Sequence, residues 1–371
     1  MIALVTDAIG PWHRGGKEQR YVEIARRLAE RAEVHIYTMN WWQGEKIRRD
    51  GNVTYHAIAP WLPLYSGPRR SIRQAILFAV CCLRLVTERF DVIEADHMPY
   101  VQLFPLRLVA WLRRKRLVVT WHECWGPEYW RSYLGQPGRV GWLLERAAMR
   151  LPDMIIAASP QTADRLREFT RGRVPIVVAP NGIDLAIVDE IEAAGDPADV
   201  VVVGRLLPHK RIDLLLEALA ILKEEGRPVS ARIVGGGPQL ADLTTQATAL
   251  GLADFVEFRQ DISDQRLLYG VLKASRVAVF PSEREGFGIA VLEALACGTP
   301  VITTSAPANY AQYLIDEAAG GGVVCDPTAP ALADAIRDTL ERTGIDAGYD
   351  TSWLRRYSWA TTADSVADAL S

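Results

Sequence analysis

Short apolar runs alternate with segments of helical periodicity along the whole chain, a pattern typical of parallel sheets covered by helices. The runs in the first half read IALVTD, EVHIYT, DVIEA, RLVVTWH, MIIAAS and IVVAP. Those in the second half read DVVVVG, SARIVG, DFVEF, RVAVF, TPVITT and GGVVC. The segment Glu18–Glu30 carries apolar residues at helical spacing and predicts the first helix. The pattern therefore predicts an α/β protein with doubly wound parallel sheets.

The length of the chain predicts two domains, because 371 residues are about twice the length of a usual domain. Asn181-Gly182 predicts a turn between the run IVVAP and an acidic stretch. We place the boundary there, with a first domain over 1–183 and a second over 184–350. The segment 351–371 contains a closing helix for which Ser358 is a suitable N-cap. Periodicity alone does not say where this helix packs.

Several features bear on the location of the protein. No apolar run reaches the roughly 18 residues of a membrane-spanning helix, since Arg84 and Arg107 interrupt the best candidates. The N-terminus runs straight into a strand pattern without the features of a signal peptide. Five cysteines, with no C-x-x-C pair, fit neither a disulfide framework nor a zinc site and predict reduced thiols. A cytoplasmic location is expected.

Charge is distributed unevenly. Residues 1–180 carry 27 Lys and Arg against 17 Asp and Glu, whereas residues 181–371 carry 15 against 28. A basic half favours anionic acceptors, membranes or nucleic acid, and the sign alone does not choose among them. The basic residues include Arg69, Arg70, Arg73 and the run Arg113–Arg116, in stretches that also contain Trp61 and Trp111. Our hypothesis is an anionic membrane surface and a lipid-linked or phosphate-bearing acceptor, and the alternative is a solvated basic face.

The most informative stretch is FPSEREGFGIAVLEALACGTPVITT. A strand ends at Pro281, a loop contains Glu285 to Gly288, and a helix follows from about Ile289. The free N–H groups and the dipole of such a helix N-terminus favour a phosphate. Glu293 follows Glu285 by eight residues, and two carboxylates at this spacing can accept hydrogen bonds from the hydroxyls of a sugar and a ribose. The alternative is a pair of solvated carboxylates.

Three further motifs follow predicted strands. In VVVGRLLPHKRIDLLLEAL, Arg205 and Lys210 flank a loop between strand and helix and can reach a pyrophosphate. Gly15-Gly16 and the loop from Gly235 to Pro238 allow backbone amides to approach a phosphate. In VVTWHECWG, His122 comes directly after the fourth predicted strand, at the ligand edge of the sheet. Taken singly, each motif also has an ordinary structural explanation.

Together and in this order, the motifs resemble glycosyltransferase family 4, the retaining enzymes of the GT-B fold, over nearly the whole chain. They are GG near the N-terminus, H-E after the fourth strand, APNGID at 179–184, VGR-x4-K, the GGGP loop, PSEREGFG-x4-E and a closing YSW. The N-terminal stretch is also similar to members that build lipopolysaccharide cores and other lipid-linked glycans. The resemblance implies two Rossmann-like domains facing each other across a cleft. The first would bind the acceptor, the second the nucleotide sugar, and the closing helix would return to the first.

The resemblance also implies roles for individual residues. The catalytic residues would be His122, Arg205, Lys210 and Glu285. The donor-binding residues would be Gly15, Gly16, Gly235, Gln260, Asp261, Ile262, Gly286, Phe287, Gly288 and Glu293. Among these, Glu293 would hold the ribose, and the stretch around Gln260 the base. Glu123 departs from the family pattern, since many members have Asp after the histidine, which leaves the role of this position open.

The implied activity is transfer of a hexose from a UDP-sugar, or from GDP-mannose, to a glycan or lipid-linked acceptor in the synthesis of cell-envelope glycans. Arg and Lys would supply the positive charge at the diphosphate, so no metal and no cofactor are expected, and the sequence contains no D-x-D motif. The protein would be cytoplasmic, peripheral on the inner face of the membrane, and would bind no nucleic acid. The alternatives are an epimerase or hydrolase of the same fold, and a non-catalytic protein that binds nucleotide sugars.

Overall fold

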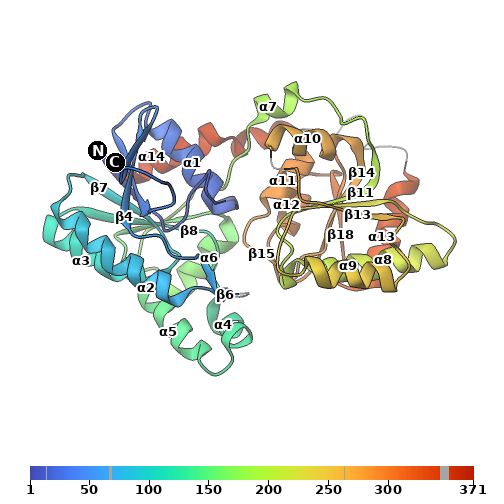
Figure 1. The fold of residues 1–371 in the computed structure, drawn as a ribbon, viewed down its shortest axis with the longest axis horizontal. Coiled ribbons are helices and arrows are strands. Elements are labelled where there is room, and N and C mark those ends of the chain that lie inside the picture. The colour runs from blue at the N-terminus through green and yellow to red at the C-terminus, as the bar shows by residue number, and fades with distance from the viewer. Residues whose placement is uncertain (14, 67–68, 263, 343–350) are drawn as a thin grey trace. The chain divides into compact units, whose positions relative to one another are not determined.

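The computed structural model of the protein describes residues 1–13, 15–66, 69–262, 264–342 and 351–371. It divides into two compact units, Met1–Gly182 with Trp359–Ser371 and Ile183–Ser358. Each unit contains a mainly parallel sheet with helices on both faces (Figure 1). The closing segment expected to pack on the first domain is divided between the units. Residues from Trp359 onward join the first, whereas Leu354 and Tyr357 are buried in the core of the second.

The first sheet has the strand order β10-β9-β8-β7-β1-β2-β4-β3, and within it β3 and β4 pair antiparallel. Its strands are β1 (Ile2–Val5), β2 (Val34–Met39), β3 (Ile47–Asp50), β4 (Val53–Ala59), β7 (Val92–Asp96), β8 (Arg116–Trp121), β9 (Met154–Ala157) and β10 (Ile176–Val178). A separate ribbon is formed by β5 (Tyr65–Ser66) and β6 (Arg69–Arg70). All six predicted runs are strands, while β3 and β4 were not predicted. Every residue of β3 is exposed, so it carries no apolar pattern.

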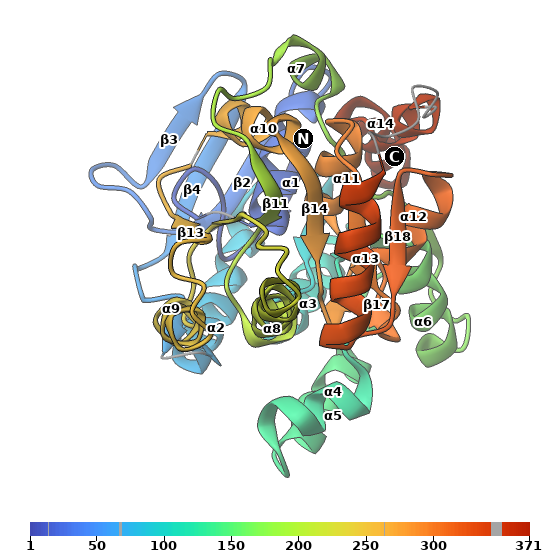
Figure 2. The same ribbon diagram turned by 90° about the vertical axis from the view of Figure 1, so that its right-hand side faces the viewer.

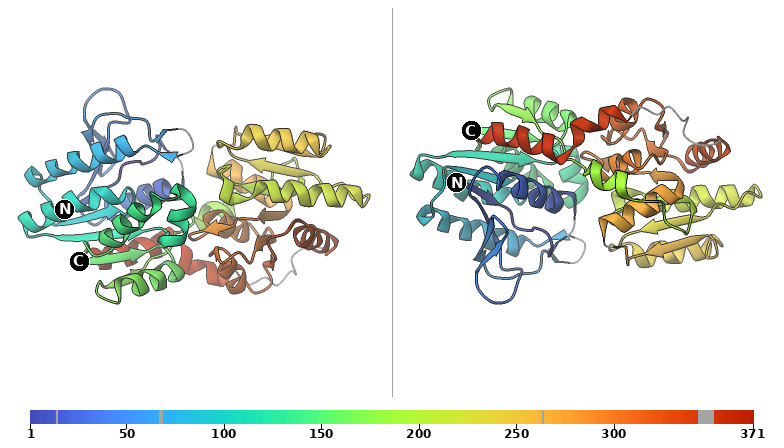
Figure 3. Two further views of the ribbon diagram at one scale, coloured as in Figure 1. Left: turned by 90° about the horizontal axis from the view of Figure 1, so that it is seen from below. Right: turned by 90° about the horizontal axis from the view of Figure 1, so that it is seen from above.

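Helices cover both faces of this sheet, because alternate residues of its strands point to opposite sides. Ala3 and Val5 belong to one core and Ile2 and Leu4 to the other. One face is covered by α1 (Gly16–Leu28) and α14 (Trp359–Leu370), which lie side by side (Figures 1 and 3). The other face carries α2 (Ile72–Cys81), η1 (Cys82–Thr87), η2 (Tyr100–Gln102), α3 (Leu103–Arg113), α4 (Gly126–Leu134), α5 (Gly138–Ala148) and α6 (Pro160–Thr170). The first helix begins two residues before its predicted start.

The second sheet is parallel, with the order β13-β12-β11-β14-β16-β18. Its strands are β11 (Ala198–Val203), β12 (Ala231–Val234), β13 (Val256–Arg259), β14 (Ser275–Phe280), β16 (Val301–Thr304) and β18 (Gly322–Cys325), as predicted, and β15 (Arg284–Glu285) pairs with β17 (Ala308–Asn309). One face is covered by α8 (Ile212–Glu224), α9 (Leu240–Ala249) and α13 (Ala329–Glu341). The other carries α7 (Leu185–Glu190), α10 (Gln265–Ala274), α11 (Ile289–Ala296), α12 (Gln312–Glu317) and η4 (Ser352–Tyr357), and η3 (Pro208–Lys210) precedes α8.

The chain leaves the first unit after Gly182 and returns to it at Trp359. Arg20, 2% exposed, fixes the exit by donating hydrogen bonds from Nη1 to the Pro180 carbonyl at 2.9 Å and to Asn181 Oδ1 at 3.2 Å. Gly182 packs directly on Trp359, since a Cβ at this glycine would lie 2.6 Å from the Trp359 backbone nitrogen. The exit and return points of the first unit are therefore in contact.

Two predictions made from composition can be compared with the structure. All five cysteines are free thiols, as predicted. The described ranges contain no helix that is both long enough and apolar enough to cross a membrane.

We predict that Gly182→Ala destabilises the first unit by about 1–3 kcal/mol, because the added methyl group overlaps the backbone of Trp359. Gly195→Ala is the matched control, since a Cβ there meets no atom within 4 Å. Urea unfolding followed by tryptophan fluorescence measures the difference. Equal midpoints for the two variants would show that Gly182 is not confined by Trp359.

Candidate functional site

The second sheet has a switch point between β11 and β14, because successive strands extend outward from these two in opposite directions. Loops that leave such strands diverge and form a crevice at the carboxyl edge of the sheet, where ligands bind. A pocket lies at this point, lined by Val202, Val203, Gly204, Arg205, Lys210, Ile212, Phe280, Pro281 and Ser282. Arg205 and Lys210, both predicted from the sequence, therefore line one pocket.

Lys210 forms an ion pair with Glu285 from β15, and the Nζ–Oε2 distance is 2.5 Å. The two side chains are 23% and 18% exposed, so solvent or a ligand can still reach the pair. The Glu283 N–H donates a hydrogen bond to the His209 carbonyl at 2.8 Å, which joins η3 to the loop before β15. Three of the four residues predicted to be catalytic, Arg205, Lys210 and Glu285, are thus brought together in the second unit.

The loop after β15 leads into the N-terminus of α11. Gly288 has a φ of +96°, and a Cβ there would lie 2.7 Å from the Cβ of Ala311, so this position requires glycine. Gly286 is half-buried. The Phe287 ring is buried and lies 5.7 Å from the Tyr357 ring, so only the backbone of Phe287 can face a ligand. The helix begins at Ile289, as the sequence predicted, and the N–H groups of a helix N-terminus favour an anion.

Glu293 lies on the buried side of α11 and is only 5% exposed. Its carboxylate accepts a hydrogen bond from Gln265 Nε2 at 3.1 Å. Burial raises the pKa of this carboxyl to about 7, although hydrogen bonds from Gln265 and Tyr269 oppose the shift. The group is therefore poised between the neutral and ionised forms at neutral pH. Gln265, which sequence reasoning missed, holds the carboxylate in place.

The loops after β11, β12 and β13 contain the other predicted donor-binding residues of this unit. Gly235 has a φ of +135°, and a Cβ there would lie 2.0 Å from the Gly204 carbonyl oxygen, so the first two loops pack backbone to backbone. Gln260 and Asp261 are exposed after β13. Asp261 accepts hydrogen bonds from Arg259 at 2.7 Å, while Ile262 is half-buried. These residues lie on the loop that follows the edge strand β13.

The first unit has its own switch point, between β1 and β7, and a buried cluster of charges occupies it. The Nζ atom of Lys17, from the first turn of α1, lies 2.9 Å from Asp7 Oδ1 and 2.5 Å from Asp96 Oδ2. Both carboxylates are fully buried. Arg70 and Gln74 also donate to Asp7 Oδ2, at 2.6 and 3.2 Å. One ammonium group therefore bridges the ends of two neighbouring strands.

The charges in this cluster stabilise one another. Burial alone would raise the pKa of Asp7, but Arg70 and Lys17 outweigh it and hold the pKa below its ordinary value. Burial acts in the same direction on Asp96, and there Lys17 and His97 hold the pKa well below the ordinary value. Burial lowers the pKa of Lys17, but the two carboxylates more than compensate and raise it. All three groups are therefore charged at neutral pH.

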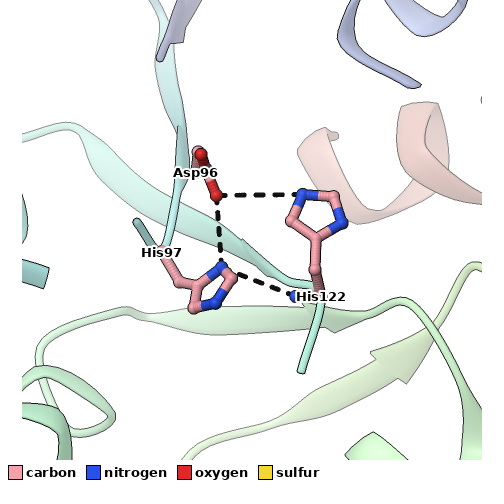
Figure 4. Close-up of side chains that lie close together, drawn as sticks. All are labelled: Asp96, His97 and His122. Atoms are coloured by element: carbon pink, nitrogen blue, oxygen red, sulfur yellow. Dashed lines mark hydrogen bonds and ion pairs between the residues drawn. The ribbon is translucent and has the colours of Figure 1, made fainter. Parts of the chain in front are cut away.

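His122, the fourth residue predicted to be catalytic, follows β8 and lies beside Asp96 and His97 (Figure 4). Its Nε2 atom is 3.8 Å from Asp96 Oδ1, and His97 Nδ1 is 3.1 Å from the same oxygen. Burial lowers the pKa of His122 to about 3, although Asp96 opposes the shift. The imidazole is neutral at physiological pH and can exchange a hydrogen bond with a hydroxyl group without carrying charge.

Asp96, His97 and His122 form one group among the described residues that could offer three ligand atoms to a metal ion, within 4.8 Å of one another. The Lys17 ammonium group already lies 2.5 Å from Asp96 Oδ2. A second cation at this carboxylate would be repelled by Lys17. The donor atoms fit a metal ion, whereas the neighbouring charge opposes one.

Gly15 and Gly16 lie at the start of α1, where the sequence predicted a phosphate contact. Gly15 is the N-cap residue, and a Cβ there would lie 2.4 Å from Glu18 Oε2. Sequence reasoning missed Lys17, Asp7 and Asp96. Their signal was present, since Asp7 and Asp96 end or follow predicted strands, but an isolated aspartate in these positions is common and the ion pairs appear only in three dimensions.

The sequence matches two family models that together span most of the chain. Residues 14–187 match the model described as Glycosyltransferase Family 4, and residues 186–347 match the one described as Glycosyl transferases group 1. D-inositol 3-phosphate glycosyltransferase of Geodermatophilus obscurus is 27% identical, covering 98% of this chain and 86% of that protein. The GDP-mannose-dependent alpha-(1-6)-phosphatidylinositol monomannoside mannosyltransferase of Mycolicibacterium smegmatis is 26% identical, covering 99% and 97%.

Solved structures show the same fold. HepE from Anabaena, determined in complex with UDP-glucose, is 22% identical, has a TM-score of 0.74, and covers 100% of this chain and 98% of its own. WaaG, a glycosyltransferase involved in lipopolysaccharide biosynthesis, is 20% identical with a TM-score of 0.68, covering 99% and 95%. The predicted GT-B architecture, with two parallel-sheet α/β domains, is therefore confirmed.

We predict that Lys17→Met destabilises the first unit by about 3–5 kcal/mol at neutral pH, because two buried carboxylates lose their shared cation. Without Lys17 the folded-state pKa of Asp96 rises, because burial loses its strongest opponent, and the pKa of Asp7 rises less, because Arg70 still pairs with it. The loss of stability is then small at low pH and grows as the pH rises through those values. Urea unfolding followed by tryptophan fluorescence measures it, since ten of the 11 tryptophans lie in this unit.

Lys115→Met is the matched control, because Lys115 pairs with Asp91 at the surface, and we expect it to cost less than about 1 kcal/mol. A similar loss in both variants, or a loss from Lys17→Met that does not change with pH, would contradict a bridging role for Lys17.

Proposed function

Because the chain belongs to the glycosyltransferases that join a family 4 domain to a group 1 domain, we propose that it transfers a hexose, with retention, to a glycan or lipid-linked acceptor. The donor in this proposal is a nucleoside diphosphate sugar, a UDP-sugar first and GDP-mannose second. The observation that carries the proposal is the pocket at the switch point of the second sheet, where Arg205 and Lys210 supply positive charge beside the carboxylate of Glu285.

The pocket fits the chemistry of a departing nucleoside diphosphate. As the bond to the sugar breaks, negative charge grows on the diphosphate, and cations already in place stabilise that charge most in the transition state. Lys210 would exchange its ion pair with Glu285 for the diphosphate, which leaves the Glu285 carboxylate available to the hydroxyl groups of the sugar. The N–H groups of Gly286, Phe287 and Gly288, at the start of α11, would hold further oxygens.

Other predicted residues take supporting roles in the proposal. Glu293, held by Gln265, would accept hydrogen bonds from the ribose, and the loop at Gln260–Ile262 would contact the base. The neutral imidazole of His122 would contact a sugar hydroxyl from the first unit, and Gly15 and Gly16 would approach the phosphates. Arg205 and Lys210 supply two positive charges, so we propose a reaction that requires neither a metal ion nor a cofactor.

The names of similar proteins point to two different donors. The Mycolicibacterium relative is named for GDP-mannose and acts on a phosphatidylinositol mannoside, whereas HepE was determined with UDP-glucose. Both names are consistent with a hexose donor, and the mycolicibacterial protein also supports a lipid-linked acceptor. We propose that the protein acts in the synthesis of cell-envelope glycans.

An exposed apolar surface on the first unit supports a peripheral association with the cytoplasmic face of the membrane. It is formed by the outer sides of α2, η1 and α3, which contact one another. Its large apolar side chains, each at least 38% exposed, are Ile72, Ile76, Val80, Leu83, Phe104, Leu108, Trp111 and Leu112. Arg73, Arg84 and Arg113 are exposed on the same segments, and so is Arg114, the C-cap of α3. Exposed apolar side chains with arginines near them in sequence fit an anionic bilayer, and no nucleic acid is part of the proposal.

We predict that the protein releases one nucleotide from a panel of UDP-, GDP- and ADP-sugars when a membrane lipid extract is added. Lys210→Ala should reduce the rate at least about a hundredfold, because charge stabilisation of the leaving group is lost. Lys223→Ala is the control, since Lys223 lies on the surface of the same unit and bonds the Gly251 carbonyl. A chelator should leave the rate unchanged, and NMR of the product should show the anomeric configuration of the donor. Equal release without lipid would favour a hydrolase or epimerase, and no release a binding protein.

We predict that Ile76→Asp combined with Trp111→Asp reduces co-sedimentation with anionic liposomes at low salt at least about tenfold, because charged groups replace apolar contacts in the bilayer. The control is Leu267→Asp combined with Tyr313→Asp, which places the same two charges at exposed apolar residues of the second unit. Equal binding by the double variant and the wild type would show that α2 and α3 do not face the membrane.

A further inference from the structure

A group of aromatic side chains lies directly after His122, at the carboxyl edge of the first sheet. Trp125, Tyr129 and Tyr133 recur every four residues, so they lie along one side of α4. The centroid of the Trp125 ring lies 4.6 Å from that of Tyr129, with an angle of 73° between the ring planes. For Trp125 and Tyr133 the centroid distance is 5.3 Å and the interplanar angle is 71°. The two tyrosine rings are nearly parallel, at 5.9 Å and 13°. We call these three rings the α4 platform.

The α4 platform borders the contacts that hold α4 against α5, since the centroids of the Trp125 and Tyr133 rings lie 4.8 and 6.4 Å from that of Trp130. Those contacts centre on Trp130, which is 8% exposed and donates from Nε1 to Glu145 Oε2 at 2.7 Å. The backbone and ring of Trp130 leave no room for side chains at Gly138 and Gly141 of α5, where a Cβ would lie within 2.3 Å of them. The hairpin of α4 and α5, which extends from the first unit in Figure 2, is therefore closed by Trp130.

The platform is also held in a fixed orientation. The buried carboxylate of Glu145 accepts hydrogen bonds from the backbone N–H groups of Trp125 and Gly126, at 2.9 and 3.1 Å. Its Oε1 atom accepts a further bond from Tyr100 at 3.1 Å. All three platform residues are half-buried rather than buried, so the platform is not closed off from solvent. A rigid aromatic surface of this kind loses little entropy when a ligand packs on it.

A carboxylate stands next to the rings. Glu123 Oε1 accepts a hydrogen bond from Trp125 Nε1 at 2.6 Å, and the side chain of Glu123 is itself partly exposed. Saturated six-membered polyol rings present C–H groups on one face and hydroxyl groups around the edge. The C–H face packs on aromatic rings, and the hydroxyl groups donate to a carboxylate. Rings and carboxylate together match a sugar better than they match a lipid chain, which has no donor for Glu123.

We propose that the α4 platform, with Glu123, binds a sugar ring of the acceptor. The proposal rests on the transferase function above and adds the chemistry of the acceptor, a polyol ring that packs on Tyr129 and Trp125 and donates a hydroxyl group to Glu123. Only two residues separate His122 from Trp125, which keeps this ring close to the edge where the proposed reaction occurs. The proposed sugar contact also gives a role to Glu123, the position that departs from the family pattern.

The experiment is fluorine NMR of the full chain labelled with 5-fluorotryptophan and titrated without donor. The probes are methyl α-D-glucopyranoside, methyl α-D-mannopyranoside and myo-inositol, with the acyclic polyol sorbitol as control. The Trp125 resonance is identified by its absence from Trp125→Phe. We expect it to shift saturably with at least one ring polyol and not with sorbitol, while the resonance of the exposed Trp61 stays in place.

Tyr129→Ala should weaken this binding about tenfold, while Tyr129→Phe should change it less than about twofold. Unchanged resonances of the other tryptophans in Tyr129→Ala would confirm that the variant is folded. The proposal is overturned if no ring polyol shifts the Trp125 resonance, if sorbitol shifts it equally, or if Tyr129→Ala binds as tightly as the wild type. Because the titration needs neither donor nor turnover, its failure is separate from a failure of the proposed transfer reaction.

Discussion

The ammonium group of Lys17 lies between the carboxylates of Asp7 and Asp96, and the ligand edge of the first unit depends on this contact. Two buried carboxylates at the ends of adjacent parallel strands would repel each other without a shared cation. With Lys17 in place, the start of α1 is fixed to both strands, and with it Gly15 and Gly16. Asp96 in turn lies against His97 and His122, so one cation orders the edge from β1 to β8.

The second unit has a comparable ion pair at its switch point, but the charged side chains are less buried. Its switch point also brings a lysine and a carboxylate together, but Lys210 and Glu285 remain partly exposed, whereas Asp7 and Asp96 do not. A buried bridge is costly to break and suits a structural role, while a partly solvated pair can exchange partners at small cost. The two units therefore have similar residues at equivalent positions of their sheets. The ion pairs of Lys17 are fixed by burial, whereas the partly exposed pair of Lys210 and Glu285 can exchange partners.

The sequence was sufficient for twelve strands, because each of them is a short apolar run that needs no partner to be recognised. It missed β4, which is largely buried and pairs parallel with β2, but whose apolar residues alternate with Thr54 and His56. It was insufficient for β3, whose residues are all exposed, and for the division of the closing segment, which depends on Tyr357 and Trp359 packing in different cores. The residues at the switch point of the second sheet were predicted because their motifs are local. The cluster at Lys17 was missed because Asp96 is distant in sequence from Asp7 and Lys17, and each residue is ordinary alone.

The contact between Gly182 and Trp359 has a consequence for the order in which the protein can fold as it is made. The second unit is inserted within the first, so all of Ile183–Ser358 must be synthesised before α14 exists. Until then, the core that contains Trp359, Ala363 and Val366 is not covered by α14, and the apolar side of α1 lacks this neighbouring helix. The inserted unit can reach its native state before α14 has been made, whereas the first unit cannot, so the first unit is the later of the two to complete its fold.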